Sequence, residues 1–104
     1  MNNLKNKTFF STTNGDVNKT DDIYTLFAYK VWKVLKNKCN ASVFVINDND
    51  ILVIKITKGP FSFKHLIPQI GPKLLEGLTV DSVVREILDL YKTEVLKWFF
   101  NKHE

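Results

Sequence analysis

The few side chains that could act as nucleophiles, bases or metal ligands are scattered along the chain. Cys39 is the single cysteine, and His65 lies 26 positions further along the sequence. A transition-metal site needs Cys, His and carboxylate ligands at set spacings, and a cysteine nucleophile needs a histidine beside it in an electropositive site. The sequence shows neither arrangement. We therefore expect no metal and no cofactor, with His65 structural and Cys39 buried.

Two further patterns approach a catalytic motif and fall short of it. Asp48 and Asp50 precede a segment carrying Lys55, as in metal-dependent nuclease cores, but the acid that such cores need two residues before the lysine is here Val53. The four glycines form no glycine-rich phosphate loop between a strand and a helix. We interpret the two aspartates as turn residues and predict that the protein is not an enzyme.

Composition places the chain among single-domain proteins with a basic balance. It has 104 residues, 44% hydrophobic and 25% charged, a net charge of +4 and a pI near 9.2. Residues 1–75 hold eleven Lys against five Asp, so the basic excess belongs to this part. A single cysteine forms no internal disulfide, and no apolar run has the length of a signal peptide or a membrane span. These features predict a cytoplasmic location and no membrane partner.

The elements that must position any site begin after a polar arm. Residues 1–20 are predicted to be a flexible or irregular arm, with a short strand through Thr8, Phe9 and Phe10 as the alternative. Residues 21–39 are predicted to be a helix. Its expected apolar stripe consists of Tyr24, Phe27, Val31, Val34 and Leu35, with Ile23 and Ala28 alongside.

The second half of the chain predicts strands followed by a long helix. Residues 42–47 and 51–57 predict a β-hairpin, residues 61–67 a third strand, and residues 80–101 a helix capped by Thr79. Gly71 and Pro72 begin a short turn or helical piece between them. We therefore predict an α+β domain over residues 21–104. It has a small antiparallel sheet of two to three strands, flanked by two main helices in the order α-β-β-(β)-α.

The hairpin strands carry apolar residues on both faces. Val43 and Val45 point one way, and Phe44 and Ile46 point the other. A strand that is apolar on both faces needs cover on both faces. A helix on each side of the sheet or a second copy of the protein would supply that cover.

The order helix, three strands, helix is similar to that of double-stranded RNA-binding domains, which use a basic start of the last helix to read RNA. The last helix here begins at Thr79, Val80 and Asp81, without a lysine cluster. The resemblance is one of topology, and it implies no function for this chain.

One candidate surface is basic and lies on the first helix. Lysines there fall opposite the predicted core stripe at helical spacing, an aromatic and a leucine lie among them, and further lysines follow on the strands. The patch comprises Leu26, Tyr29, Lys30, Lys33, Lys36, Lys55, Lys58 and Lys64. Such a surface could hold phosphates and stack a base, or it could be an ordinary solvated helix face. With Arg85 as the one arginine, any nucleic-acid binding should be weakly sequence-specific.

A second candidate surface is aromatic and lies near the C-terminus. Leu96, Trp98, Phe99 and Phe100 cannot all be buried against one sheet by a single helix face. Exposed aromatic clusters favour protein interfaces. The alternative is packing against the N-terminal arm with its Phe9 and Phe10.

These surfaces lead to two hypotheses. The first is a small non-enzymatic, regulatory or inhibitory protein that binds another protein, with self-association into a homo-oligomer as a further option. The second is a nucleic-acid-binding accessory protein that uses the lysine-rich helix face.

Overall fold

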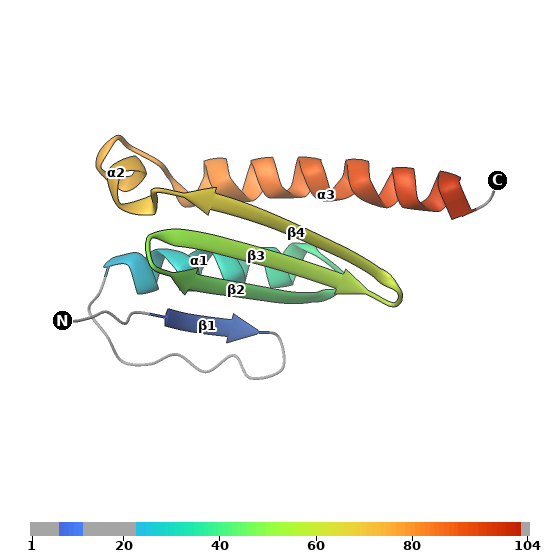
Figure 1. The fold of residues 1–104 in the computed structure, drawn as a ribbon, viewed down its shortest axis with the longest axis horizontal. Helices are drawn as coiled ribbons and strands as arrows, with labels where there is room; N and C mark the ends of the chain where they lie inside the picture. The colour runs from blue at the N-terminus through green and yellow to red at the C-terminus, as the bar shows by residue number, and fades with distance from the viewer. Residues whose placement is uncertain (1–6, 12–22, 103–104) are drawn as a thin grey trace.

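The computed structural model describes residues 7–11 and 23–102, which form one antiparallel sheet and three helices (Figure 1). The strands follow one another across the sheet in the order β1-β2-β3-β4. They are β1 (Lys7–Ser11), β2 (Ser42–Asp48), β3 (Ile51–Lys58) and β4 (Phe61–Pro68). The helices are α1 (Ile23–Lys38), α2 (Ile70–Leu75) and α3 (Val80–Lys102). The predicted α+β class, the three strands after the first helix and both main helices are confirmed.

The N-terminal arm contributes a strand to the sheet. Of the two predictions for residues 1–20, the short strand through Thr8 and Phe10 is the one observed, because β1 pairs with β2 and places Phe10 opposite Val45. The rest of the arm lies outside the described residues. The sheet therefore gains a fourth strand on the edge opposite β4.

Two-residue turns fix the register of the three later strands. Asn49 and Asp50 join β2 to β3 with φ angles of 49° and 67°, and two positive φ values are typical of a type I′ hairpin. Gly59 and Pro60 join β3 to β4, and the φ of 60° at Gly59 is a conformation that glycine adopts without strain. These turns align β3 residue by residue with both neighbours.

Both main helices cover the same face of the sheet. Alternate strand residues are buried there, and their partners across the sheet, such as Val43, Ile56 and Phe63, lie in one row. The Trp32 side chain of α1 reaches β2 on this face, and the Tyr91 ring of α3 contacts Phe63 of β4. Of the two kinds of cover considered for a sheet that is apolar on both faces, a helix on each side is not observed among the described residues. Instead, α1 and α3 pack against each other over one face and share one hydrophobic core.

The buried face of α1 is rotated from the predicted stripe. Trp32 is 2% exposed and its Nε1 donates a hydrogen bond to the backbone oxygen of Val43 at 3.2 Å. Ile23 and Tyr24, predicted at the start of the stripe, are 61% and 40% exposed. The long tryptophan side chain buries more apolar area than either first-turn residue, and this decides which face meets the sheet.

Side-chain hydrogen bonds define the starts of α2 and α3. The Asp50 carboxylate accepts a hydrogen bond from the Gly71 backbone N–H at 2.7 Å, so a residue of the first hairpin turn caps α2. A Cβ on Gly71 would lie 3.1 Å from that carboxylate oxygen, which explains the glycine. The Thr79 hydroxyl accepts a bond from the backbone N–H of Ser82 at 3.2 Å, and this confirms the predicted N-cap of α3.

Helix α3 is longer than the sheet that it covers. Its 23 residues correspond to about 35 Å of helix, whereas eight residues of strand correspond to about 26 Å. Figure 1 shows its C-terminal end running past the turn between β3 and β4. The last turns of α3 therefore have no strand beneath them.

Candidate functional site

A groove of about 660 Å³ lies where α3 leaves the sheet. Three parts of the fold enclose it: the C-terminal end of α1, the β3–β4 turn and the second half of α3. Its lining consists of Lys38, Cys39, Asn40, Lys58, Phe61, Leu88, Tyr91, Lys92, Val95, Leu96 and Trp98. This volume falls within the range of about 300–1,000 Å³ that is usual for ligand sites.

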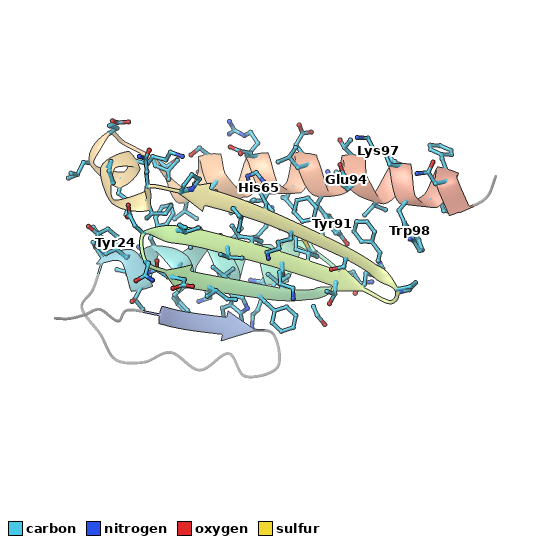
Figure 2. All side chains as sticks on the ribbon, in the orientation of Figure 1. Tyr24, His65, Tyr91, Glu94, Lys97 and Trp98 are labelled. Carbon is cyan, nitrogen blue, oxygen red and sulfur yellow. The ribbon has the colours of Figure 1, made fainter. Side chains whose placement is uncertain are left out.

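Aromatic rings form one wall of the groove. The Phe61 ring lies 5.8 Å from the Trp98 ring and 5.9 Å from the Tyr91 ring, both edge to face. Figure 2 shows Tyr91 and Trp98 on the side of α3 that faces β4. Two helical turns separate these residues, so both project onto one face, and Phe61 on β4 meets them from the sheet. The contacts hold a rigid apolar surface in place.

Lysines surround the mouth of this apolar surface. Lys38 comes from the end of α1, Lys58 from the end of β3 and Lys92 from the middle of α3, and all three are exposed. Within the part of the chain that the structure describes, no aspartate or glutamate lines the groove. The arrangement can bind an apolar group that carries a negative charge at its edge, because the lysine heads reach a carboxylate while the rings exclude water.

The two acidic protons inside the groove, on the Cys39 thiol and the Tyr91 hydroxyl, are held more firmly than usual. Burial raises the pKa of the Cys39 thiol, and the nearby Lys92 ammonium opposes this to a smaller extent. Burial also raises the pKa of the Tyr91 hydroxyl, and the neighbouring Cys39 adds to the effect. A thiol with a raised pKa is a poor nucleophile at neutral pH.

The remaining candidate for catalysis is engaged in a structural contact. The His65 ring nitrogen Nε2 lies 3.1 Å from a Glu86 carboxylate oxygen and joins β4 to α3. Within residues 7–11 and 23–102 no cluster of three or more His, Cys, Asp and Glu side chains could hold a metal ion. His65 therefore connects β4 to α3 through Glu86, and its structural role stays a prediction.

The structure joins part of the predicted aromatic interface to the groove. Leu96 and Trp98 line it, and Phe99 and Phe100 follow on the extension of α3, where they are 47% and 60% exposed. The two phenylalanine rings contact each other edge to face, with centroids 5.9 Å apart. The alternative, packing against the N-terminal arm, concerns the Phe9 and Phe10 side chains, which lie outside what the structure describes.

The predicted lysine patch is divided among three places. Lys30, Lys33 and Lys36 lie on α1 with Leu26 and Tyr29, and the ammonium of Lys36 lies 4.6 Å from the centre of the Trp32 ring. Lys58 is at the groove. Lys55 and Lys64 face each other on β3 and β4, on the sheet face that the helices leave open. The eight residues therefore do not form one surface.

Sequence reasoning missed most of the groove. Lys38, Cys39 and Lys92 were not predicted to share a site, because the approach of α1 to α3 is a tertiary contact that no local pattern records. The length of the last helix was one signal in the sequence that could have indicated the groove. The apolar stripe of the last helix continues through Tyr91, Val95 and Trp98, beyond the reach of strands of seven or eight residues.

Comparisons with models of protein families, with curated proteins and with solved structures found no match to this chain. Among the described residues, no helix combines the length and the apolar character needed to cross a membrane.

Proposed function

We propose that this protein is a non-enzymatic binding protein, and that its groove takes an amphipathic, acidic segment of another protein. The observation that supports the proposal is the groove itself, in which an apolar wall of aromatic rings stands beneath Lys38, Lys58 and Lys92, and none of the described lining residues is acidic. Apolar contacts would supply most of the affinity. The lysines would select carboxylates and speed association.

The extent of the apolar surface favours a polypeptide segment over a small molecule. From Leu96 in the groove the apolar surface continues along α3 to Phe99 and Phe100, and each of the three is about half exposed or more. A short amphipathic helix places apolar side chains at intervals of three and four residues, and such a helix can follow a groove of this kind over several turns. Its polar face would carry the acidic residues to the lysine rim.

The test measures binding of two labelled helical peptides that share leucine positions and differ in charge. One carries glutamates on its polar face and the other carries lysines at the same places. Fluorescence anisotropy should show binding of the acidic peptide alone. Leu96→Asp should weaken it about tenfold or more, because a charge then faces the apolar wall. Lys92→Glu should weaken it as well, with the larger loss at low salt.

Matched controls separate the groove from the rest of the surface. Leu75 on α2 is 91% exposed and outside the groove, so Leu75→Asp should leave peptide affinity unchanged. Lys30→Glu on α1 changes the net charge as Lys92→Glu does and should also have no effect. Equal binding of both peptides, or equal losses from Leu96→Asp and Leu75→Asp, would contradict the proposal.

Self-association through the same aromatic residues is the competing outcome. Light scattering would then show a dimer that Phe100→Asp converts to a monomer, and the acidic peptide would compete with dimer formation. A dimer that the peptide does not disturb would place the self-contact elsewhere, and it would remove the argument for Phe99 and Phe100 as part of the peptide site.

A further inference from the structure

The sheet face turned away from the helices carries an ordered set of side chains. On β2, β3 and β4 the residues that alternate with the buried ones point to this face. Strand register arranges them in rows that cross the three strands. Phe44, Lys55 and Lys64 form the middle row.

The middle row places two positive charges together. Lys55 and Lys64 are directly opposite each other on adjacent antiparallel strands, where Cβ atoms are about 4.5–5.5 Å apart. Both are exposed, and neither forms an ion pair with any residue that the structure describes. Like charges in this position oppose sheet formation, so an anionic group bound between the two ammonium groups would relieve their repulsion.

The neighbouring rows complete a surface of mixed chemistry. On one side lie the hydroxyl residues Ser42, Thr57 and Ser62, which can donate and accept hydrogen bonds. On the other side lie the aliphatic residues Ile46, Val53 and Leu66. Each part of a nucleotide has a suitable row. The lysines can hold phosphates, the hydroxyl residues can hydrogen-bond to sugars or base edges, and the aromatic and apolar side chains can contact base faces.

We propose that this open sheet face binds single-stranded nucleic acid without strong sequence preference. Lys55 and Lys64 would contact successive phosphates, and Phe44 in the same row would supply the ring on which a base stacks. The net charge of +4 favours a polyanion generally. This site is separate from the groove and does not depend on the function proposed for it.

Charge also argues against a second copy of the protein on this face. Two sheets packed face to face would bring two Lys55–Lys64 pairs into one buried interface, and like charges brought together there are strongly unfavourable. The lysine pair lies between the hydroxyl row and the aliphatic row, and a charged pair at that place is unfavourable in the apolar core of a protein interface.

The sheet lysines are better placed to bind nucleic acid than the lysines of the first helix. The ammonium groups of Lys33 and Lys36 lie over the Tyr29 and Trp32 rings, 5.9 and 4.6 Å from the ring centres. These helix lysines are thus engaged with aromatic rings of their own helix, on the side of the molecule opposite the open sheet face.

The test is fluorescence anisotropy with labelled oligothymidine and oligouridine at two salt concentrations. Two phosphate contacts on a single strand predict that affinity falls about sevenfold between 50 and 200 mM salt, from a slope of about −0.7 for each phosphate. Lys55→Glu with Lys64→Glu should abolish binding. Lys30→Glu with Lys33→Glu makes the same change of charge on α1 and should keep it.

Further variants test the role of the Phe44 ring, and folding measurements exclude misfolding as the cause of lost binding. Phe44→Leu keeps an apolar side chain and removes the aromatic face, so affinity should fall by a few fold while the salt dependence stays the same. Circular dichroism and thermal unfolding must show that each variant is folded. Lys64→Glu alone provides a second charge variant, with an opposite-charge pair on the sheet, and it too should lose binding.

Three results would overturn the proposal. The first is absence of binding at the lower salt concentration. The second is an equal loss from the helix pair and the sheet pair of lysine variants. The third is competition by polyglutamate as effective as competition by unlabelled oligothymidine, since it would show that the face accepts an acidic polypeptide as readily as a nucleic acid.

Discussion

The position of Cys39 between the core and the groove determines the pKa of its thiol. It lies one residue beyond the end of α1, 8% exposed, and its backbone N–H donates to the Leu35 carbonyl oxygen at 2.8 Å. The thiol thus belongs to the apolar core and to the lining of the groove at once. Its raised pKa follows from that double position, because a thiolate there would lose water on one side and gain the Lys92 ammonium on the other.

The pKa shifts of Cys39 and Tyr91 predict a loss of stability at alkaline pH. Burial raises both pKa values in the folded protein, so each group ionises more readily in the unfolded chain. Their contribution to the free energy of unfolding should therefore be constant below the ordinary cysteine pKa of about 8.5 and decrease as the pH rises above it. Urea unfolding at a series of pH values measures this decrease.

A cysteine variant serves as the control for this prediction. In Cys39→Ala the first part of the alkaline decrease should disappear, and a decrease near the ordinary tyrosine pKa of about 10 should remain. A pH profile identical to that of the parent protein would show that the thiol has no part in it. Thiol labelling at neutral pH should be slow in the folded protein and fast in urea.

The packing of Trp32 also depends on contacts that its sequence neighbours do not show. Its ring is almost fully buried and its one donor is satisfied by the Val43 carbonyl oxygen, which joins α1 to β2 through a specific bond. Because Trp32 lies among Lys30, Lys33 and Lys36, local spacing predicts that it belongs to the polar side of the helix. Local spacing cannot show that the adjacent strand offers an acceptor for it.

At the scale of elements, the sequence predicted most of the fold for identifiable reasons. β-branched runs around Asn49 and Gly59 predicted three strands, because turn residues and strand residues obey local rules. Thr79 predicted the start of the last helix, because a capping hydroxyl acts on the next backbone N–H groups. These features depend on neighbours in the sequence, and the structure confirms them.

Features that depend on distant contacts could not be predicted in the same way. The arrangement of both helices on one sheet face is set by packing, as is the groove between Lys38 and Lys92. The capping of α2 by Asp50, at 21 positions from Gly71, is also a tertiary contact. The fold likewise divides the predicted lysine patch among three places, because periodicity within α1 does not show which sheet face Lys55 occupies.

The facing lysines of β3 and β4 yield a prediction at this scale. Replacing Lys64 by glutamate turns a like-charge cross-strand pair into an opposite-charge pair, which should raise the free energy of unfolding by about 0.2–1 kcal/mol. Thermal and urea unfolding measure the change. Lys73→Glu on α2, which has no strand partner, is the control and should not raise stability. Unchanged or lower stability in Lys64→Glu would show that the two ammonium groups do not repel each other appreciably.

The whole molecule is elongated because one helix exceeds the body that it covers. The Cα atoms span 51 × 29 × 24 Å, and α3 runs along the long direction (Figure 1). The N-terminal half of α3 holds the buried residues Val83, Val84 and Ile87, whereas Phe99 and Phe100 stand beyond the sheet. Stability and binding should therefore depend on different parts of the same helix.

Shortening α3 tests that separation. A chain ending at Trp98 lacks Phe99, Phe100 and the last turn, all outside the buried core. Its free energy of unfolding should lie within about 0.5–1 kcal/mol of that of the full chain, because little apolar area is lost from the core. Its affinity for the acidic helical peptide should fall several fold. A large loss of stability would mean that the end of α3 supports the fold and is not a separate binding surface.

The two tryptophans occupy the two regions that this division creates. Trp32 is sealed between α1 and β2, and Trp98 stands half-buried on the wall of the groove (Figure 2). The intrinsic emission of the protein thus has one component shielded from dissolved quenchers and one component open to them. Iodide should quench the Trp98 component alone in the free protein, and a ligand in the groove should shield it, while Trp32 responds only when the domain unfolds. The chain carries its own pair of optical probes, one for occupancy and one for folding.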